Sequence, residues 1–433
     1  MDKCKEAVYL NSYFEDAFYI RRMWSFSRAL DLGLVDEEIE RGLQVSLGKR
    51  HGERVAYIAM RLGRALELSK EELVQVTVAG LLHDIGALGC FRAYNGDHRI
   101  LEKHCLAGAE TVKHFPMGEI LAPAIMYHHE TPDPEHSALR APAEEVPLMA
   151  RILSLADQID LRLKRRLASH REREEILEWI RMETGTLFYP EVAAAFKRVA
   201  QKEAFWLDIE QADLFQIALG LLFGQWQLPA TRELEPGFTE DLAATFADLI
   251  DQKSKFTARH SRSVAEIVER LARGLGWEEG RLHEIYVAGL LHDLGKLSIP
   301  KKILDKPGPL DPSEIEIIRT HTYYTHRLLT EAGFPTRMVE WASHHHERLD
   351  GKGYPFSLAG IEIDVGARLM SIADIFAALT EDRPYRLAMT PGEAMALIQR
   401  GAGTMVDSDL VDLAKRVLVD TALGHTTQSK LTV

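Results

Sequence analysis

The sequence predicts an all-α protein whose chain repeats itself once in tandem. The helix-forming residues Leu, Ala, Glu and Arg dominate, and long alternations of apolar and polar residues, which indicate strands, are absent. Apolar residues recur at the spacing of one helix face in both halves of the chain. The 433 residues are too many for one ordinary core, and 46% apolar and 27% charged residues are usual for a globular protein.

The chain is acidic, with a formal net charge of −13 and a pI near 5.8. This charge argues against DNA as a partner and against a membrane-surface protein, because both need a basic field. A small anionic substrate needs only a local basic pocket and is not excluded. The three cysteines (Cys4, Cys90 and Cys105) are odd in number and match no zinc ribbon. The N-terminus lacks the apolar core of a signal peptide. Together with the cysteine pattern, this indicates a cytoplasmic protein.

The sequence predicts four consecutive segments, and an uncharged stretch and a chain break lie between the two copies. An uncharged stretch of 18 residues, Leu214 to Thr231, contains glutamines and a proline. We therefore predict a buried interdomain helix there and no membrane span. Pro229, Pro236 and Gly237 then break the chain before the second copy. The predicted domains are N-terminal helices at 1–40, a degenerate first copy at 41–200, a helical linker at 201–235 and the second copy at 236–433.

The repeat is carried by matching motifs at constant offsets. His51-Gly-Glu-Arg-Val matches His260-Ser-Arg-Ser-Val, an offset of 209 (260 minus 51), and the apolar face of the following helix keeps that offset. VAGLLHDIGAL, from Val78, matches VAGLLHDLGKL, from Val287, at the same offset. After an insertion of eight residues the offset is 217. Such agreement indicates a tandem duplication with diverged copies.

Each copy contains seven histidine and aspartate residues that are able to bind metal. Imidazole and carboxylate without thiolate suit iron, manganese, cobalt, nickel or zinc. Seven ligands are too many for one ion and fit two ions with a bridging carboxylate. In the second copy the candidates are His260, His292, Asp293, His321, His345, His346 and Asp374.

The order of these ligands resembles the HD superfamily of metal-dependent phosphohydrolases. The second copy also carries HDLGKLSIP, HHERLDGKGYP and ADIFAALTEDRPYR, which resemble the HD-GYP phosphodiesterases of bacterial cyclic-dinucleotide signalling. The resemblance covers nearly all of residues 250–410. It implies two tandem HD-type helical bundles and hydrolysis of a 3′–5′ phosphodiester in cyclic di-GMP or 3′,3′-cyclic GMP-AMP.

The resemblance also implies how the ligands divide between two ions. His260, His292, Asp293 and Asp374 would hold one ion, and Asp293, His321, His345 and His346 the other, with Asp293 as the bridge. Iron or manganese is the first expectation, and nickel, cobalt and zinc also fit. Four residues depart from the family pattern, and the absence of a glutamate at Phe256 favours two metals over three. The departures are Thr322, Thr325, Ala377 and Phe256.

Three further segments of the second copy are expected to act on substrate. Lys296 follows the catalytic Asp293 by three residues, nearly on the same helical face, and its ammonium would stabilise the phosphoryl charge. The loop Arg383-Pro-Tyr385-Arg386 would grip the second phosphate and stack on a base. The DGKGYP loop, which contains Tyr354, would lie at the lip of the site and shape substrate entry or a surface for a protein partner.

The first copy keeps the ligands and loses the substrate-binding residues. Ala87 replaces Lys296, and PDPEHS (Pro132 to Ser137) replaces the GYP loop. This copy could bind metal structurally, hydrolyse another phosphate or regulate the second copy, and we rank regulation or scaffolding first. Its ligand set is His51, His83, Asp84, His104, His128, His129 and Asp157.

Two other functions compete with the phosphodiesterase. One is a metal-loaded receptor that binds the cyclic dinucleotide, and the other is a di-iron oxygenase of the HD superfamily. The complete ligand set together with Lys296 favours the enzyme over the receptor. The DGKGYP and RPYR segments argue against the oxygenase. The choice between the two dinucleotides, the metal, the input signal and a homodimer are left open by the sequence.

Overall fold

The all-α prediction is confirmed by the computed structural model. Its described residues form helices and no β-strand, and their isolated bridges are Thr184 with Phe188 and Ala402 with Val406. The chain divides into two compact units, Met1–Ala230 and Thr231–Val433. The structure describes residues 16–40, 50–87, 98–163, 168–211, 213–224, 238–253, 259–382 and 387–420.

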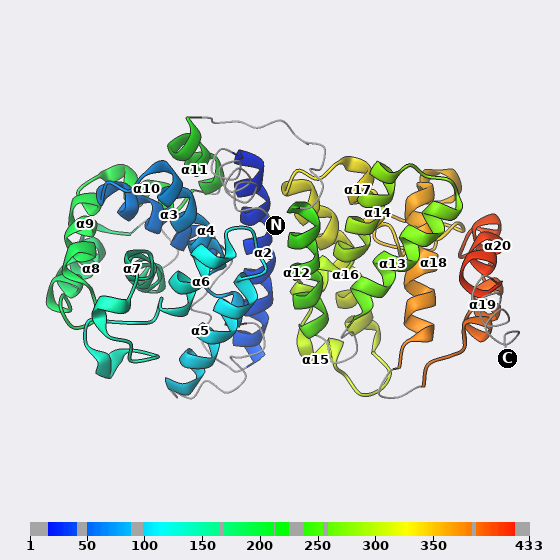
Figure 1. Ribbon diagram of the computed structural model, residues 1–433, viewed down its shortest axis with the longest axis horizontal. Coiled ribbons are helices and arrows are strands. Elements are labelled where there is room, and N and C mark those ends of the chain that lie inside the picture. Colours follow the sequence, from blue (N-terminus) through cyan, green and yellow to red (C-terminus); the bar gives the residue numbers. More distant parts are fainter. Residues whose placement is uncertain are drawn as a thin grey trace, which may run out of the picture. The chain divides into compact units, whose positions relative to one another are not determined.

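The first unit is a bundle in which α3 packs against α4, α7 and α9 (Figure 1). Its helices are α2 (Ala17–Glu40), α3 (His51–Ala65), α4 (Lys70–Leu82), η1 (Ile85–Ala87), α5 (His98–Val112), α6 (Gly118–Met126), η3 (Pro134–His136), η4 (Ala143–Glu145), α7 (Leu148–Arg162), α8 (His170–Met182), α9 (Pro190–Ala200), α10 (Glu203–Ile209) and α11 (Leu214–Phe223).

The second unit repeats this arrangement, with α13 packed against α14 and α18. Its elements are α12 (Phe238–Lys253), α13 (His260–Gly274), α14 (Glu279–Leu291), η5 (Leu294–Ser298), α15 (Lys301–Leu304), α16 (Pro312–Glu331), α17 (Thr336–Ser343), η6 (Gly360–Glu362), α18 (Val365–Thr380), α19 (Pro391–Gln399), α20 (Ser408–Lys415) and the π-helix η7 (Arg416–Asp420).

A glycine in each unit lets the two central helices approach closely. A Cβ on Gly80 of α4 would lie 2.7 Å from the Cα of Ala56 on α3. A Cβ on Gly289 of α14 would lie 2.7 Å from the Cα of Ala265 on α13. These positions keep the offset of 209, so the same close packing exists in both copies. In the first unit this packing places His83, which follows α4, beside His51, which begins α3. In the second unit it places His292, which follows α14, beside His260, which begins α13.

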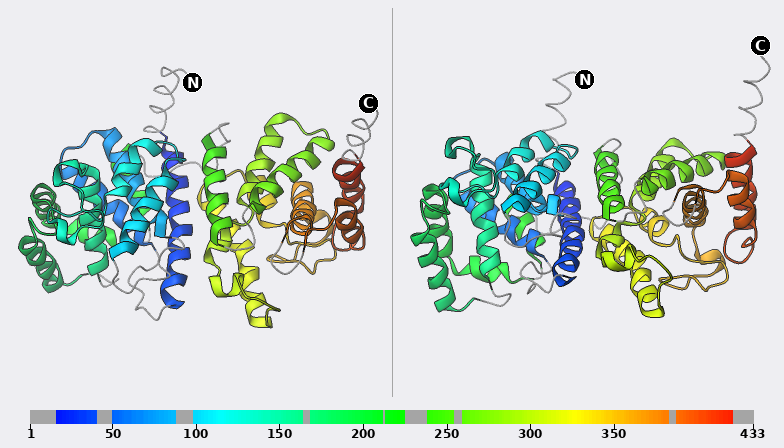
Figure 2. Two further views of the ribbon diagram at one scale, coloured as in Figure 1. Left: turned by 60° about the horizontal axis from the view of Figure 1, so that its bottom comes forward. Right: turned by 90° about the horizontal axis from the view of Figure 1, so that it is seen from below.

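The duplication extends further toward the N-terminus than the sequence motifs indicate. Figure 2 shows α2, in blue, as a long helix along one side of the first unit, where it packs against α3 and α4. Asp31 of α2 accepts a hydrogen bond from the backbone N–H of Gly52, at 3.2 Å. In the second unit Asp251 of α12 accepts the equivalent bond from Ser261, also at 3.2 Å. The helix α2 is therefore the counterpart of α12, and the repeat includes part of the segment 1–40.

The helices after α9 pack within the first unit, although the sequence places residues 201–235 in a linker. Phe205 and Trp206 of α10 and Leu214 and Leu219 of α11 are buried. The helix α11 contacts α2, α3 and α4, because burying its apolar side chains needs the surface of the bundle. Among the described residues, no helix combines the length and apolar character needed to cross a membrane.

Candidate metal centres and substrate pocket

The second-unit site is built on a sharp turn after α14. His292 is the C-terminal cap of α14, and Asp293 precedes the 3₁₀-helix η5. A Cβ on Gly295 would lie 1.9 Å from the carbonyl oxygen of His321, so this turn presses directly on α16. Thr325 joins the two, because its Oγ1 accepts from the N–H of Gly295 at 2.9 Å and donates to the carbonyl of His292 at 3.1 Å. This departure from the family pattern therefore holds the turn in place.

Three histidines of this site are oriented in the same way. Each ring Nδ1 lies 2.6–2.7 Å from the backbone carbonyl three residues earlier in the chain. A carbonyl only accepts, so Nδ1 carries the proton and Nε2 keeps its lone pair. This is the tautomer that a metal ligand needs. The histidines concerned are His292, His321 and His345.

The free ring nitrogens converge on Asp293. The Nε2 atoms of His292 and His321 lie 3.2 and 3.4 Å from its carboxylate oxygens, and that of His345 lies 4.0 Å away. These Nε2 atoms and Oδ1 of Asp293 are buried and have no hydrogen-bond partner in the described part of the chain. Buried polar atoms are normally satisfied, so this donor set fits metal ions.

The carboxyl group of Asp293 is held in the anionic form that a bridging ligand requires. Burial acts to raise its pKa, but the electrostatic interactions with His292 and Lys296 keep that pKa well below its ordinary value. The ammonium of Lys296 contacts the carboxylate directly, and the side chain of Lys296 remains 23% exposed. Lys296 therefore lies at the rim of the cage, where it is accessible to an anionic ligand.

His260 and Asp374 complete one side of the cage. Nε2 of His260 lies 3.0 Å from Oδ1 of Asp374, and its Nδ1 lies 3.1 Å from Oε2 of Glu381. Burial acts to lower the pKa of His260, and the hydrogen bonds to these two carboxylates raise it to about 9. Glu381 was not predicted from the sequence as a site residue. The available signal was its spacing, because it follows Asp374 by seven residues, or two helical turns.

A cavity of about 220 Å³ adjoins the predicted ligands His345 and His346. Tyr354 of the DGKGYP loop lines it, with its ring centroid 4.9 Å from that of His346. Three cations also line the cavity, and the guanidinium of one of them, Arg319, lies 5.2 Å from the centroid of Tyr354. Arg319 was not predicted from the sequence as a site residue. The other two cations are Arg348 and Lys352, and the predicted Arg383, Tyr385 and Arg386 lie outside the described residues.

Glu347 holds the DGKGYP loop against the ligand pair. Its carboxylate accepts hydrogen bonds from the N–H groups of Phe356 at 2.7 Å and Leu358 at 3.0 Å. In the first unit Glu130 accepts the same bonds from Leu139 and Ala141, both at 2.7 Å. The loop scaffold is thus common to both units, although the first unit lacks the glycines and the tyrosine.

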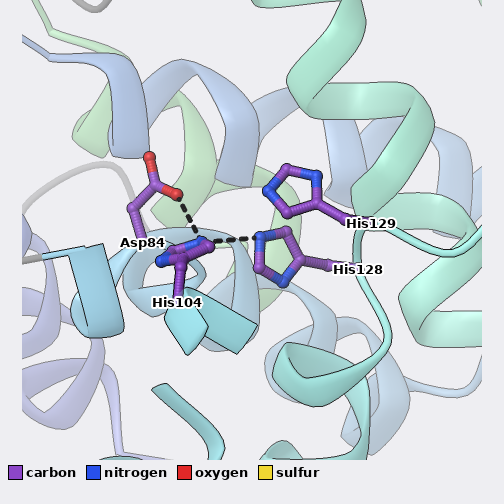
Figure 3. Close-up of side chains that lie close together, drawn as sticks. All are labelled: Asp84, His104, His128 and His129. Atoms are coloured by element: carbon purple, nitrogen blue, oxygen red, sulfur yellow. Dashed lines mark hydrogen bonds and ion pairs between the residues drawn. The ribbon is translucent and has the colours of Figure 1, made fainter. Parts of the chain in front are cut away.

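The predicted ligands of the first unit also come together. Figure 3 shows His104 between Asp84 and His128, with its Nε2 at 3.2 and 3.1 Å from their nearest atoms, and His129 alongside. Nε2 of His51 lies 3.3 Å from Oδ1 of Asp157. Asp84, His104, His128 and His129 form one group able to hold an ion, and His51, His83 and Asp84 form another.

In each unit an acidic side chain orients the histidine that begins α3 or α13, but the two acids come from different positions. Nδ1 of His51 lies 2.7 Å from Oδ2 of Asp160, which also pairs with Arg54. The position equivalent to Asp160 in the second unit is Ala377, and Glu381 takes over its contact. The second unit therefore keeps this interaction with an acid from a different position, the residue that caps the C-terminus of α18.

Comparison with known proteins agrees with this geometry. Residues 244–410 and residues 49–162 each match the HD domain family. The 3′3′-cGAMP-specific phosphodiesterase 1 of Vibrio cholerae is 34% identical over 386 residues, which cover 84% of this chain and 86% of that protein. The chain belongs to the HD-GYP family of cyclic-dinucleotide phosphodiesterases.

Two further phosphodiesterases match a shorter part of the chain or match its fold. The cyclic di-GMP phosphodiesterase PA4108 of Pseudomonas aeruginosa is 39% identical over 142 residues, 33% of this chain and 34% of that protein. The crystal structure of a cyclic GMP-AMP-specific phosphodiesterase of V. cholerae superimposes with a TM-score of 0.64 at 25% identity and covers 92% of this chain and 97% of the other. The HD-GYP match therefore includes both units.

Proposed function

We propose that the second unit is a metal-dependent phosphodiesterase that opens a 3′–5′ phosphodiester of a guanine-containing cyclic dinucleotide. The single observation that carries this proposal is the convergence of buried, unsatisfied Nε2 atoms on Asp293 beside Lys296. These groups lie next to a cavity lined by cations, which suits a substrate with two phosphates.

The seven predicted ligands of the second unit would hold two divalent transition-metal ions, and Asp293 would be shared by both. When bound, such a pair supplies a hydroxide nucleophile at neutral pH and offsets phosphate charge. Iron and manganese are proposed first, because the ligands are imidazole and carboxylate without thiolate. Anomalous diffraction that found one ion in fully active protein would contradict the two-ion assignment.

The chain contributes charge and position to the reaction. Lys296 leaves its contact with Asp293 and donates to a non-bridging phosphate oxygen, where negative charge increases in the transition state. Arg319, Arg348 and Lys352 hold the rest of the dinucleotide, and the ring of Tyr354 supports a base or ribose. Because this cavity holds about 220 Å³, one end of the substrate enters it and the remainder stays at the mouth. The loop Arg383 to Arg386 is proposed as a further phosphate anchor.

We propose 3′,3′-cyclic GMP-AMP as the preferred substrate and cyclic di-GMP as the slower one. The relatives whose match extends over 74–84% of this chain are named as specific for the former, whereas PA4108 matches 33%. The first unit is proposed to bind metal without turning over the dinucleotide, since Ala87 stands where the second unit has Lys296. A protein partner at the DGKGYP loop and a homodimer stay predictions.

The proposal is tested by metal analysis combined with chromatographic turnover of both dinucleotides. The wild-type protein loaded with iron or manganese is expected to give linear product from both. Asp293→Ala is expected to be metal-poor and inactive, because it removes the group shared by both ions. If loaded protein bound the dinucleotide in single-turnover conditions and left it intact, the chain would be a receptor and the enzyme proposal would fail.

A further inference from the structure

The first unit contains a large cavity that is separate from its metal cage. It has a volume of about 820 Å³ and lies at the C-terminal ends of α3 and α9, with walls from α10 and α11. His51 begins α3, whereas Arg61 and Arg64, which line the cavity, lie in its last two turns. At 1.5 Å per residue the cavity is roughly 15–20 Å from the cage along this helix.

The lining of this cavity is strongly basic in a chain whose net charge is −13. Two of its cations have structural contacts. Arg61 pairs with the one acid of the lining, Asp208, at 3.1 Å, and Arg198 donates to the carbonyl of Ala65 at 2.7 Å. The other two have no side-chain partner in the described residues. The four cations are Arg61, Arg64, Arg198 and Lys202.

In the second unit the equivalent arginine is neutralised by ion pairs. Arg273, the counterpart of Arg64 at the offset of 209, forms ion pairs with Glu279 at 2.6 Å and with Glu269 at 2.8 Å. At the equivalent positions the first unit has Lys70 and Met60. The first unit therefore has neither of these neutralising acids, while a cavity exists beside the arginine.

An apolar surface faces these cations. Val199 of α9 and Ile217 and Leu221 of α11 line the same cavity. The carbonyl ends of α3 and α9 offset part of the positive charge, since a helix C-terminus carries about half a negative charge. The cations still outnumber these partial charges and Asp208, which favours a ligand with more than one negative charge. Arg64, Arg198 and Lys202 are exposed and therefore accessible to such a ligand. The volume lies in the range of small-molecule sites, roughly 300–1,000 Å³.

We propose that this cavity binds a nucleoside polyphosphate, with the phosphates on Arg64 and Lys202 and the nucleoside against the apolar wall. Arginine binds phosphate through paired hydrogen bonds, and lysine adds a mobile point charge. The apolar wall gives a reason for a nucleoside in addition to the phosphates. This site is independent of the phosphodiesterase chemistry proposed for the second unit.

Calorimetric titration of the full-length protein with ATP and with inorganic tripolyphosphate tests the proposal. ATP is expected to bind, and Arg64→Ala/Lys202→Ala to weaken its binding about tenfold or more. The matched control is Arg171→Ala/Arg181→Ala, which removes two exposed arginines of α8 outside the cavity and should leave binding unchanged. A third variant, Ala204→Trp, blocks the cavity without removing charge and should also weaken binding.

The titration separates the parts of the proposal. Absence of ATP binding at millimolar concentration, or unchanged binding in both cavity variants, would overturn the site. Equal affinity for tripolyphosphate and ATP would overturn the role of the nucleoside. Melting temperature and metal content of each variant report whether the fold and the cages remain, so Ala204→Trp decides the question if the double variant fails to fold.

Discussion

Replacing Glu381 should weaken metal binding in the second unit although this residue is not a ligand. Glu381 is 23% exposed and contacts Nδ1 of His260, whose side chain is 2% exposed. A hydrogen bond to a charged group contributes on the order of 1.5–3 kcal/mol, and partial solvation reduces this to about 1–2 kcal/mol. We therefore expect Glu381→Ala to lower metal affinity by about tenfold, within the 10–100-fold typical of residues that orient a ligand.

The assay is metal affinity by competition with a chelator, measured together with turnover at saturating metal. Glu381→Gln should lie between wild type and Glu381→Ala, because its amide oxygen can still accept from Nδ1. Ala377→Asp added to Glu381→Ala should restore part of the affinity, since this position corresponds to Asp160 of the first unit. Glu331→Ala, which removes a glutamate paired with Arg327 on α16, is the control. Unchanged affinity in Glu381→Ala, or absence of rescue, would refute the orienting role.

Four further outcomes are expected. Lys296→Ala should keep its metal and lose about 10²–10³ in turnover, because one transition-state donor is removed; normal turnover would exclude this role. Asp84→Ala should lower total metal content while turnover continues, and complete loss of turnover would instead assign chemistry to the first unit. Arg319→Ala should raise KM for the dinucleotide more than it lowers kcat, as steady-state kinetics would show. Gly289→Val should destabilise the second unit by about 1–3 kcal/mol, because the added side chain overpacks the contact between α13 and α14. Gly280→Ala on the same helix has open space around it and should leave the stability unchanged. Equal melting temperatures of the two variants would contradict the close packing at Gly289.

The sequence by itself determined the helical class and the duplication, and it predicted the two sets of candidate ligands. Helical spacing and motifs such as His292-Asp293 are local, so they can be read from neighbouring residues. The resemblance to HD-GYP proteins rests on such motifs, and the comparison over 86% of a relative bears out the family. The presence of Ala87 in the first copy at the position of Lys296 could also be read from the sequence, because the offset between the two copies is constant there.

Only the tertiary structure decided the contacts between distant segments. Glu381 replaces Asp160 from a position seven residues after Asp374, and a search at the constant offset finds Ala377 instead. The pairing of Asp31 with Gly52 reveals that α2 belongs to the repeat, although no motif marks it. The large cavity combines residues from four helices of the first unit. Such features depend on which helix faces pack together, and packing tolerates a change of position whenever another side chain reaches the same point in space.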